Sequence, residues 1–198
     1  GRKDFIEKYF ETVTDLRRRG FSVAAMDWRG QGGSDRLLKN PRKCHIDDFS
    51  DYDKDLRQFM NEIVLADCPA PFFGLGHAMG AHILLRSAQT KMCWFDRLVL
   101  TSPMIDLEPQ LMELSMHRFI IEVGMLLGLG DLFLPGGSSK LRETEQFDDA
   151  KPTSDKVRFE RIQDLLNTTP QLGLGAPTIG WMHAASRSIM LINEPTFA

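Results

Sequence analysis

The sequence contains no apolar run that approaches the ~20 residues needed to span a lipid bilayer as a helix. Its 3 cysteines, Cys44, Cys68 and Cys93, are few and odd in number, and none of them forms a C-x-x-C pair. A disulfide framework and a zinc site are therefore not expected, and a reducing compartment, the cytoplasm, is predicted. Runs of lysine and arginine interleaved with aromatic residues are also absent, and the net charge is −3, so nucleic acid is not an expected partner.

The sequence also lacks the marks of natural chain ends. It starts at Gly1 without an initiator methionine or a signal peptide, and residues 194–198 carry no terminating signal. We therefore expect an internal piece of a longer polypeptide, with any targeting segment outside it. What is present is an ordinary composition: 198 residues, of which 42% are hydrophobic and 26% charged, are enough for one globular domain with a sizeable core.

Two hydrophobic patterns alternate along the first hundred residues. Short apolar runs, typical of buried strands, occur at 21–26, 71–75 and 97–101. Apolar residues spaced three and four apart, typical of amphipathic helices, occupy 4–19 and 47–64, and a third helical stretch ends near residue 90. Strands that alternate with helices of this length predict parallel βαβ units, and hence an α/β fold with a doubly wound sheet.

The pattern changes after Pro103. Residues 111–134 are rich in Leu, Met, Ile and Phe, and residues 154–167 form a further amphipathic pattern. No strand pattern occurs between 107 and 180, so a helical insertion is predicted there. The apolar stretch has two interpretations: a buried helix pair in which Met fills irregular space, or a flexible lid that covers an acyl chain and touches a membrane or micelle surface.

The segment Gly76-His77-Ala78-Met79-Gly80 lies where a predicted strand meets the following helix. A turn this tight holds its central residue in strained backbone geometry, and the flanking glycines supply the space it needs. The start of the helix directs its N-terminal dipole and free N–H groups to the same place, so the N–H of Met79 is a candidate donor to an oxyanion. The alternative is an ordinary strand-to-helix turn. In either case the Ala78 methyl group cannot act as a nucleophile.

Four segments carry, in order, a resemblance to a known family. Residues 27–34 resemble the D-x-R-G-x-G-x-S loop of the α/β-hydrolases, and residues 76–80 resemble their G-H-S-M-G nucleophile elbow with Ala78 in the place of serine. Residues 48–56 and 172–181 are similar to a helix and to the cap of the monoglyceride lipase and bacterial lysophospholipase branch, among the serine aminopeptidase S33-like hydrolases. The resemblance implies an α/β-hydrolase fold with an incomplete parallel sheet and a helical cap insertion.

The same resemblance divides the chain and assigns its site. It implies a partial core at 1–106, a helical cap at 107–180 and a return helix at 181–198. Arg2 and Met79 would supply the two N–H groups of the oxyanion hole, and Gly76, His77 and Gly80 would frame the elbow. The strand that separates 21–26 from 71–75 in the family is expected before residue 1. The catalytic Asp and His are expected after residue 198, so this chain would lack the nucleophile, the acid and the base.

Several other polar residues are candidate replacements for the missing groups. Asp106 follows the third predicted strand, where some hydrolases of this fold carry their acid, but a capping or loop role is favoured. His183 is expected to be a cap histidine, and His77 is expected to pack and hydrogen-bond locally. His45, His82 and His117 stand alone, and no pair of histidines has a metal-ligand spacing. Neither a metal nor a cofactor is therefore predicted.

Two further groups receive structural roles. Cys93 lies at the far end of the predicted helix from the turn and cannot replace the nucleophile. Asp27, Arg29 and Ser34 are expected to brace the glycine-rich loop rather than to touch a substrate.

Three functions remain open from the sequence. The first is a serine ester hydrolase acting on lysophospholipids or monoacylglycerols, with peripheral contact to the inner membrane through the cap. The second is a non-catalytic relative that binds an acyl ligand or a protein partner. The third is a hydrolase of other small esters or peptides. The intact elbow glycines around Ala78 favour the first, and the oligomeric state has no signal in the sequence.

Overall fold

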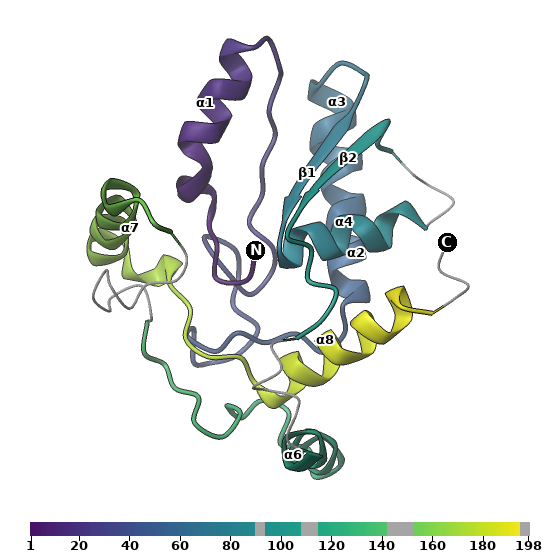
Figure 1. Ribbon diagram of the computed structural model, residues 1–198, viewed down its shortest axis with the longest axis vertical. Coiled ribbons are helices and arrows are strands. Elements are labelled where there is room, and N and C mark those ends of the chain that lie inside the picture. Colours follow the sequence, from purple (N-terminus) through teal and green to yellow (C-terminus); the bar gives the residue numbers. More distant parts are fainter. Residues whose placement is uncertain (90–93, 108–114, 142–152, 195–198) are drawn as a thin grey trace.

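The computed structural model describes residues 1–89, 94–107, 115–141 and 153–194, and the side chains of residues 115–118 are not among those described. Figure 1 shows α4 beside the two strands, with α8 crossing below them and α6 and α7 farther from the sheet. The helices and strands, in chain order, are η1 Ile6–Tyr9, α1 Phe10–Arg18, α2 Ser50–Phe59, η2 Met60–Val64, α3 Leu65–Asp67, β1 Phe73–His77, α4 Met79–Ala88, β2 Arg97–Thr101, α6 Ser115–Leu126, α7 Lys156–Thr168, η5 Pro170–Leu172 and α8 Ile179–Ile192.

The sheet consists of β1 and β2, which run parallel with Leu75 opposite Val99. The strand predicted at 97–101 is confirmed, and the one predicted at 71–75 is confirmed with a shift of two residues. Pro71 has no N–H to donate, and the N–H of Phe72 is bound by the Asp96 carboxylate at 2.8 Å, so the ladder begins only at Phe73.

The strand predicted at 21–26 is wrong. Residues 21–28 have neither helix nor strand structure, although the Phe21 ring meets Phe73 of β1 edge-on, with 6.1 Å between the ring centroids. A strand exists only where a neighbour accepts and donates the ladder hydrogen bonds, and no described segment pairs with 21–28. The apolar composition therefore predicted burial and a strand that the structure does not show, since most side chains of 21–26 are exposed.

One face of the sheet is packed and the other is open. The inward positions Gly74 and Gly76 lie against α4, and the outward side chains Phe73, Leu75 and Val99 are exposed. On the other side of α4, a larger core joins α2, α4 and α8. Its most deeply buried side chains are Ile46, Phe49, Tyr52, Met79, Ile83, Leu174, Trp181, Met182 and Ala185.

The second half of the chain is helical where it is described. The described residues from 107 to 180 contain α6, α7, η5 and the start of α8 but no strand. Isolated bridges join Cys44 to Pro177 and Phe133 to Thr178. Asp155 caps α7 by accepting hydrogen bonds from two N–H groups of its first turn. The absence of a strand pattern thus correctly predicted that these residues form no strand. The division into core, cap and return helix stays a prediction. Among the described helices, none combines the length and the apolar character needed to cross a membrane.

Candidate active site

Ala78 occupies the turn between β1 and α4 and has φ 48° and ψ −116°. An L residue adopts this conformation only under strain, which costs on the order of 1–3 kcal/mol. Gly76 makes the turn possible, because a Cβ there would lie 2.7 Å from the Cα of Ala81. Gly80 does not: a Cβ at Gly80 would meet only the Trp28 indole nitrogen at 3.8 Å, an ordinary contact. The expected steric need for both glycines holds for Gly76 alone.

Hydrogen bonds on both sides fasten the turn. The N–H of Ala78 donates to the carbonyl of Thr101 at 3.0 Å, and the carbonyl of Ala78 accepts from the N–H groups of His82 and Met104. His77 lies on the exposed face with its Nδ1 3.1 Å from the Thr101 hydroxyl, which in turn donates to the carbonyl of Gly76. His77 therefore hydrogen-bonds locally, as expected from the sequence.

The N-terminal residues lie against the elbow. A Cβ on Gly1 would come within 3.2 Å of the Ala78 methyl group, so Gly1 and Arg2 stand next to the nucleophile position. Gln31 holds them there: its side-chain amide donates to the carbonyl of Gly1 at 3.0 Å and accepts from the N–H of Lys3 at 3.3 Å. The backbone N–H groups of Arg2 and Met79 have no hydrogen-bond acceptor among the described residues. Met79 follows the strained residue and Arg2 follows Gly1, which lies against it, so these two N–H groups are candidate donors to an oxyanion.

Gln31 was missed by the sequence reasoning. It is only 3% exposed, although its type is polar and it lies in a loop. The available signal was its place between Gly30 and Gly32, where a buried amide can reach a neighbouring backbone.

The other loop residues brace the glycine-rich segment as expected. The Asp27 carboxylate accepts from the N–H of Gly33 at 2.7 Å, and the Ser34 hydroxyl donates to the carbonyl of Asp27 at 2.6 Å. Arg29 forms a two-pronged ion pair with Asp55 of α2 at 2.8 and 2.5 Å. Burial raises the pKa of Asp27, and the nearby Glu7 raises it further. None of these contacts points toward Ala78.

His45 does not stand alone, contrary to the sequence expectation. Its Nε2 lies 3.1 Å from the Asp47 carboxylate and its Nδ1 lies 2.7 Å from the Thr178 hydroxyl, which is the order of groups in a catalytic triad. Thr178 is 0% exposed, however, and its hydroxyl caps α8 by accepting from the N–H of Trp181 at 3.1 Å. A substrate cannot reach this hydroxyl, so the arrangement is a helix cap.

His82 is also part of a network rather than alone. Its Nδ1 lies 2.7 Å from the carbonyl of Met104 and its Nε2 lies 2.6 Å from the hydroxyl of Ser188 on α8. Arg86 donates to the same hydroxyl and forms an ion pair with Asp53 of α2. Burial lowers the pKa of His82 to about 4, so the ring is neutral at pH 7, with Nδ1 as donor and Nε2 as acceptor. The network ties α2, α4 and α8 together.

The remaining candidates do not complete a triad. Asp106 bonds only to the N–H of Leu107 in an exposed turn, as expected for a loop residue. The structure shows no hydrogen bond between Asp106 and His183, within the residues it describes. Cys93 and the side chain of His117 lie outside the described residues. Across the described part of the chain, no group of three His, Cys, Asp or Glu side chains could hold a metal ion.

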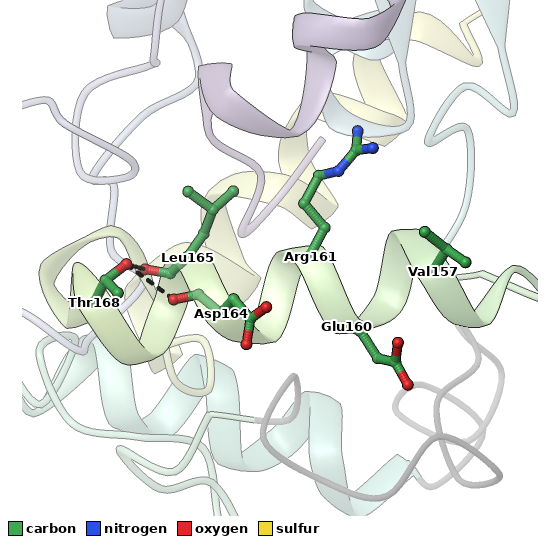
Figure 2. A pocket seen from close by; sticks show the side chains of 6 residues that line it. All are labelled: Val157, Glu160, Arg161, Asp164, Leu165 and Thr168. Carbon is green, nitrogen blue, oxygen red and sulfur yellow. Dashed lines mark hydrogen bonds between the residues drawn. The ribbon is translucent and has the colours of Figure 1, made fainter.

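Two surface hollows lie away from the elbow. The first follows one face of α7, and Figure 2 shows its Arg161 and Glu160 pointing to opposite sides of the helix rather than toward a common point. Its Thr168 hydroxyl is already bound to backbone carbonyls of the same helix. The second lies between the glycine-rich loop and α2 and includes the Arg29–Asp55 pair. Neither hollow contains Arg2, Ala78 or Met79, so neither is a candidate active site.

Comparison with known proteins agrees with this geometry. Residues 1–194 match the serine aminopeptidase S33 family. The probable lysophospholipase L2 of Haemophilus influenzae is 26% identical over 189 residues, which cover 96% of this chain and 58% of that protein. Lysophospholipase L2 of Escherichia coli is 28% identical over 210 aligned residues, covering 100% of this chain and 56% of that protein. The monoglyceride lipase of Rattus norvegicus is 30% identical over 103 residues, covering 52% of this chain and 32% of that protein.

The chain thus spans just over half the length of its lysophospholipase relatives. The family match covers almost every residue, and it includes the parallel β1–α4–β2 unit with its strained turn. The chain belongs to the serine aminopeptidase S33 family of α/β-hydrolases, and its lipase-like relatives place it among hydrolases.

Proposed function

We propose that this chain is part of a carboxylic ester hydrolase for lysophospholipids or monoacylglycerols, and that Ala78 occupies its nucleophile position. The observation that carries the proposal is the strained backbone of Ala78 between the unpaired N–H groups of Met79 and Arg2. A serine at that position would direct its hydroxyl toward an ester carbonyl whose oxygen accepts from both N–H groups. The printed names of the relatives, lysophospholipase and monoglyceride lipase, supply the substrate class.

We further propose that the chain as it stands has no esterase activity. A methyl group cannot attack a carbonyl, and the described histidines are held in caps and networks rather than beside Ala78. Even with a serine at residue 78, the hydroxyl would need a histidine to remove its proton, and a carboxylate to orient that histidine. Both are expected after residue 198.

The second candidate is a non-catalytic protein that binds an acyl ligand or a partner at the same turn. Ala78 itself favours it, because the elbow keeps its geometry without a nucleophile. Hydrolysis of other small esters or peptides is the third candidate, and the family description, a serine aminopeptidase, favours it.

Contact with a membrane surface is part of the first proposal. Large apolar side chains are exposed on α6 and just after it, at Phe119, Leu126, Leu127, Leu129 and Leu132. Apolar side chains of this kind enter the boundary between headgroups and acyl chains when a helix lies on a bilayer. We propose that this surface lets the protein collect single-chain lipids, as a cytoplasmic protein peripheral to the inner membrane.

Hydrolysis of a p-nitrophenyl acyl ester and of a lysophospholipid tests the proposal. The chain and its Ala78→Ser variant should both show no turnover. A protein of the relatives' full length that carries this sequence with Ala78→Ser should hydrolyse the lysophospholipid and should lose activity with a serine-directed inhibitor. Inhibitor-sensitive turnover by the short Ala78→Ser chain would mean that an internal pair completes the triad. No turnover by the long Ala78→Ser protein would favour the non-catalytic candidate.

A further inference from the structure

One donor of the Arg2 guanidinium group is buried near the elbow without a hydrogen-bond partner. Its Nη1 is shielded from solvent and has no hydrogen bond, and its central carbon lies 5.4 Å from the centre of the Trp181 ring. The indole N–H of Trp181 is also buried and, although it lies toward the Tyr52 oxygen, forms no hydrogen bond of normal geometry. A buried donor without an acceptor costs about 1–3 kcal/mol, and more when it is charged. The Nη1 donor of Arg2 therefore lies against α8 without an acceptor of normal geometry.

The positive charge near Arg2 is balanced only in part, by an interaction of Asp27 with Arg36. Arg36 and Arg42 donate to backbone carbonyls. Those bound by Arg36 belong to Gly32, Ser34, Pro41 and Gln171, and those bound by Arg42 belong to Pro170 and Gly173. Within the described residues, none of these three arginines forms an ion pair. Other arginines of the chain, such as Arg29 and Arg86, are paired with aspartates.

Several positively charged side chains lie near the buried thiol of Cys44. Burial raises the pKa of Cys44, and Arg2, Lys3 and Arg36 oppose that rise. The guanidinium of Arg2 also reaches the Cys44 sulfur, but a thiol is a weak acceptor and does not balance a cation. Three cations thus lie close to one neutral group.

The cluster stands next to the place where an ester would bind. Gly1 contacts Ala78, and Arg2 is the next residue, with its backbone N–H available to the ester oxygen and its side chain against α8. In a lysophospholipid the phosphate is joined to the ester by the short glycerol unit. A phosphate bound near Arg2 is therefore compatible with an ester held at Ala78. A guanidinium binds a phosphate through two parallel hydrogen bonds, which a neutral glycerol headgroup cannot accept in the same way.

We propose that the side chain of Arg2, assisted by the indole N–H of Trp181, binds the phosphate of a single-chain phospholipid and makes this site select lysophospholipids over monoacylglycerols. The inference rests on the proposed function and narrows its substrate class. Arg2 is only partly buried as a residue, so a rotation of its side chain brings Nη1 to an entering phosphate.

Binding of two matched lipids tests the inference without any need for turnover. The probes are 1-decanoyl lysophosphatidylglycerol and 1-monodecanoylglycerol, each titrated below its critical micelle concentration into the 198-residue chain by calorimetry. The phosphate lipid should bind about tenfold tighter or more, as expected for a charge-assisted hydrogen bond. Arg2→Gln should remove that advantage, measured as the ratio of the two affinities, and Arg2→Lys should restore part of it.

Two controls separate binding from folding. Arg158→Gln removes a surface arginine that pairs with Glu11, and this variant should bind both lipids like the parent chain. Arg2→Gln should unfold at the same temperature as the parent or higher, because it removes an unpaired buried cation. Equal binding of the two lipids by the parent, or unchanged phosphate-lipid binding by Arg2→Gln, would overturn the inference and leave the proposed function in place. Failure of both lipids to bind the parent would overturn the proposed function as well.

Discussion

The elbow region and the N-terminal region of this chain are packed in opposite ways. Around the elbow, α2, α4 and α8 share a continuous core, and 9 residues of α8 alone are buried. By contrast, α1 has no buried residue, the segment 21–28 has no ladder partner among the described residues, and the outward face of β1 and β2 is exposed. Figure 1 shows α1 standing apart from β1 and α4, while α8 lies close to α4.

This difference shows what holds the strained turn in place. A two-stranded sheet is marginal by itself, so the strain of Ala78 must be offset by other contacts. Those contacts come from His82 and Ser188 and from the aromatic cluster around Phe49, which fix α4 against α8 and α2. The site geometry therefore depends on side chains far apart in sequence as well as on the hydrogen bond from Ala78 to Thr101 of β2.

The largest effect is expected from a matched pair of phenylalanines. Phe49 is 1% exposed and meets Tyr52, His82 and Trp181 edge-on, whereas Phe21 is 46% exposed and meets only Phe73. Phe49→Ala should lower the free energy of unfolding by about 3–5 kcal/mol, or leave the chain unfolded, and Phe21→Ala should lower it by less than about 1 kcal/mol. Urea denaturation of both variants measures the difference. Similar losses would show that the two regions are equally well packed.

The second-largest effect is expected from acid, which should lower the free energy of unfolding through His82. The pKa of His82 is lowered from 6.5 to about 4, since burial disfavours its charged form, Arg86 opposes protonation and Asp53 only partly compensates. Between these values the unfolded chain binds a proton that the folded chain does not, so stability falls as the pH drops from 6.5 to about 4 and changes no further below that through this group.

The expected loss is on the order of 2–3 kcal/mol. Urea denaturation at several pH values should show this step in the parent chain, and a His82→Asn variant should lack it. A parent and a variant with the same pH dependence would contradict the buried neutral state of His82.

A smaller loss is expected when the link between α4 and α8 is cut. Ser188→Ala removes the hydrogen-bond partner of both His82 and Arg86 and should cost about 1–3 kcal/mol, because two buried donors or acceptors then lose a partner. Ser139→Ala is the matched control, since its exposed hydroxyl only accepts from Asn40, and it should change the stability by no more than about 0.5 kcal/mol. Equal effects of the two substitutions would show that Ser188 does not stabilise the contact between α4 and α8.

The smallest effect concerns the turn itself and has the opposite sign. Ala78→Gly should stabilise the chain by about 1 kcal/mol, because glycine adopts φ 48° without the strain of a Cβ and loses part of that gain to its greater freedom when unfolded. Ala78→Ser should leave the stability nearly unchanged. Thermal unfolding distinguishes the two, and a destabilising Ala78→Gly would mean that Ala78 is not strained.

The parts that could be predicted from the sequence are those with a local cause. The pattern of residues 97–101 placed β2, the glycine-framed turn placed the elbow, and the spacing of apolar residues placed α2 and α7 to within a few residues. Each of these signals is carried by side chains next to one another in the chain.

What could not be predicted depends on partners distant in sequence. Gln31 holds Gly1 from 30 positions away, and His82 meets Ser188 across 106 positions, so neither contact leaves a local pattern. The failure at 21–26 has the same origin, because an apolar run forms a buried strand only where a neighbouring strand covers and pairs with it, and here most of its side chains are exposed. For Gly80, the motif suggested that only glycine fits, but the structure leaves room for a Cβ there.

Native-state amide hydrogen exchange tests the central contrast most directly. The amides of Ile83 and Leu84 in α4 and of Ile189 in α8 should exchange only through opening that approaches global unfolding, because they lie in the packed region. The amides of residues 22–26, which have no backbone acceptor among the described residues, should exchange with almost no protection. Protection of 22–26 equal to that of α4 and α8 would contradict the account, since it would require a stable ladder where the structure has none.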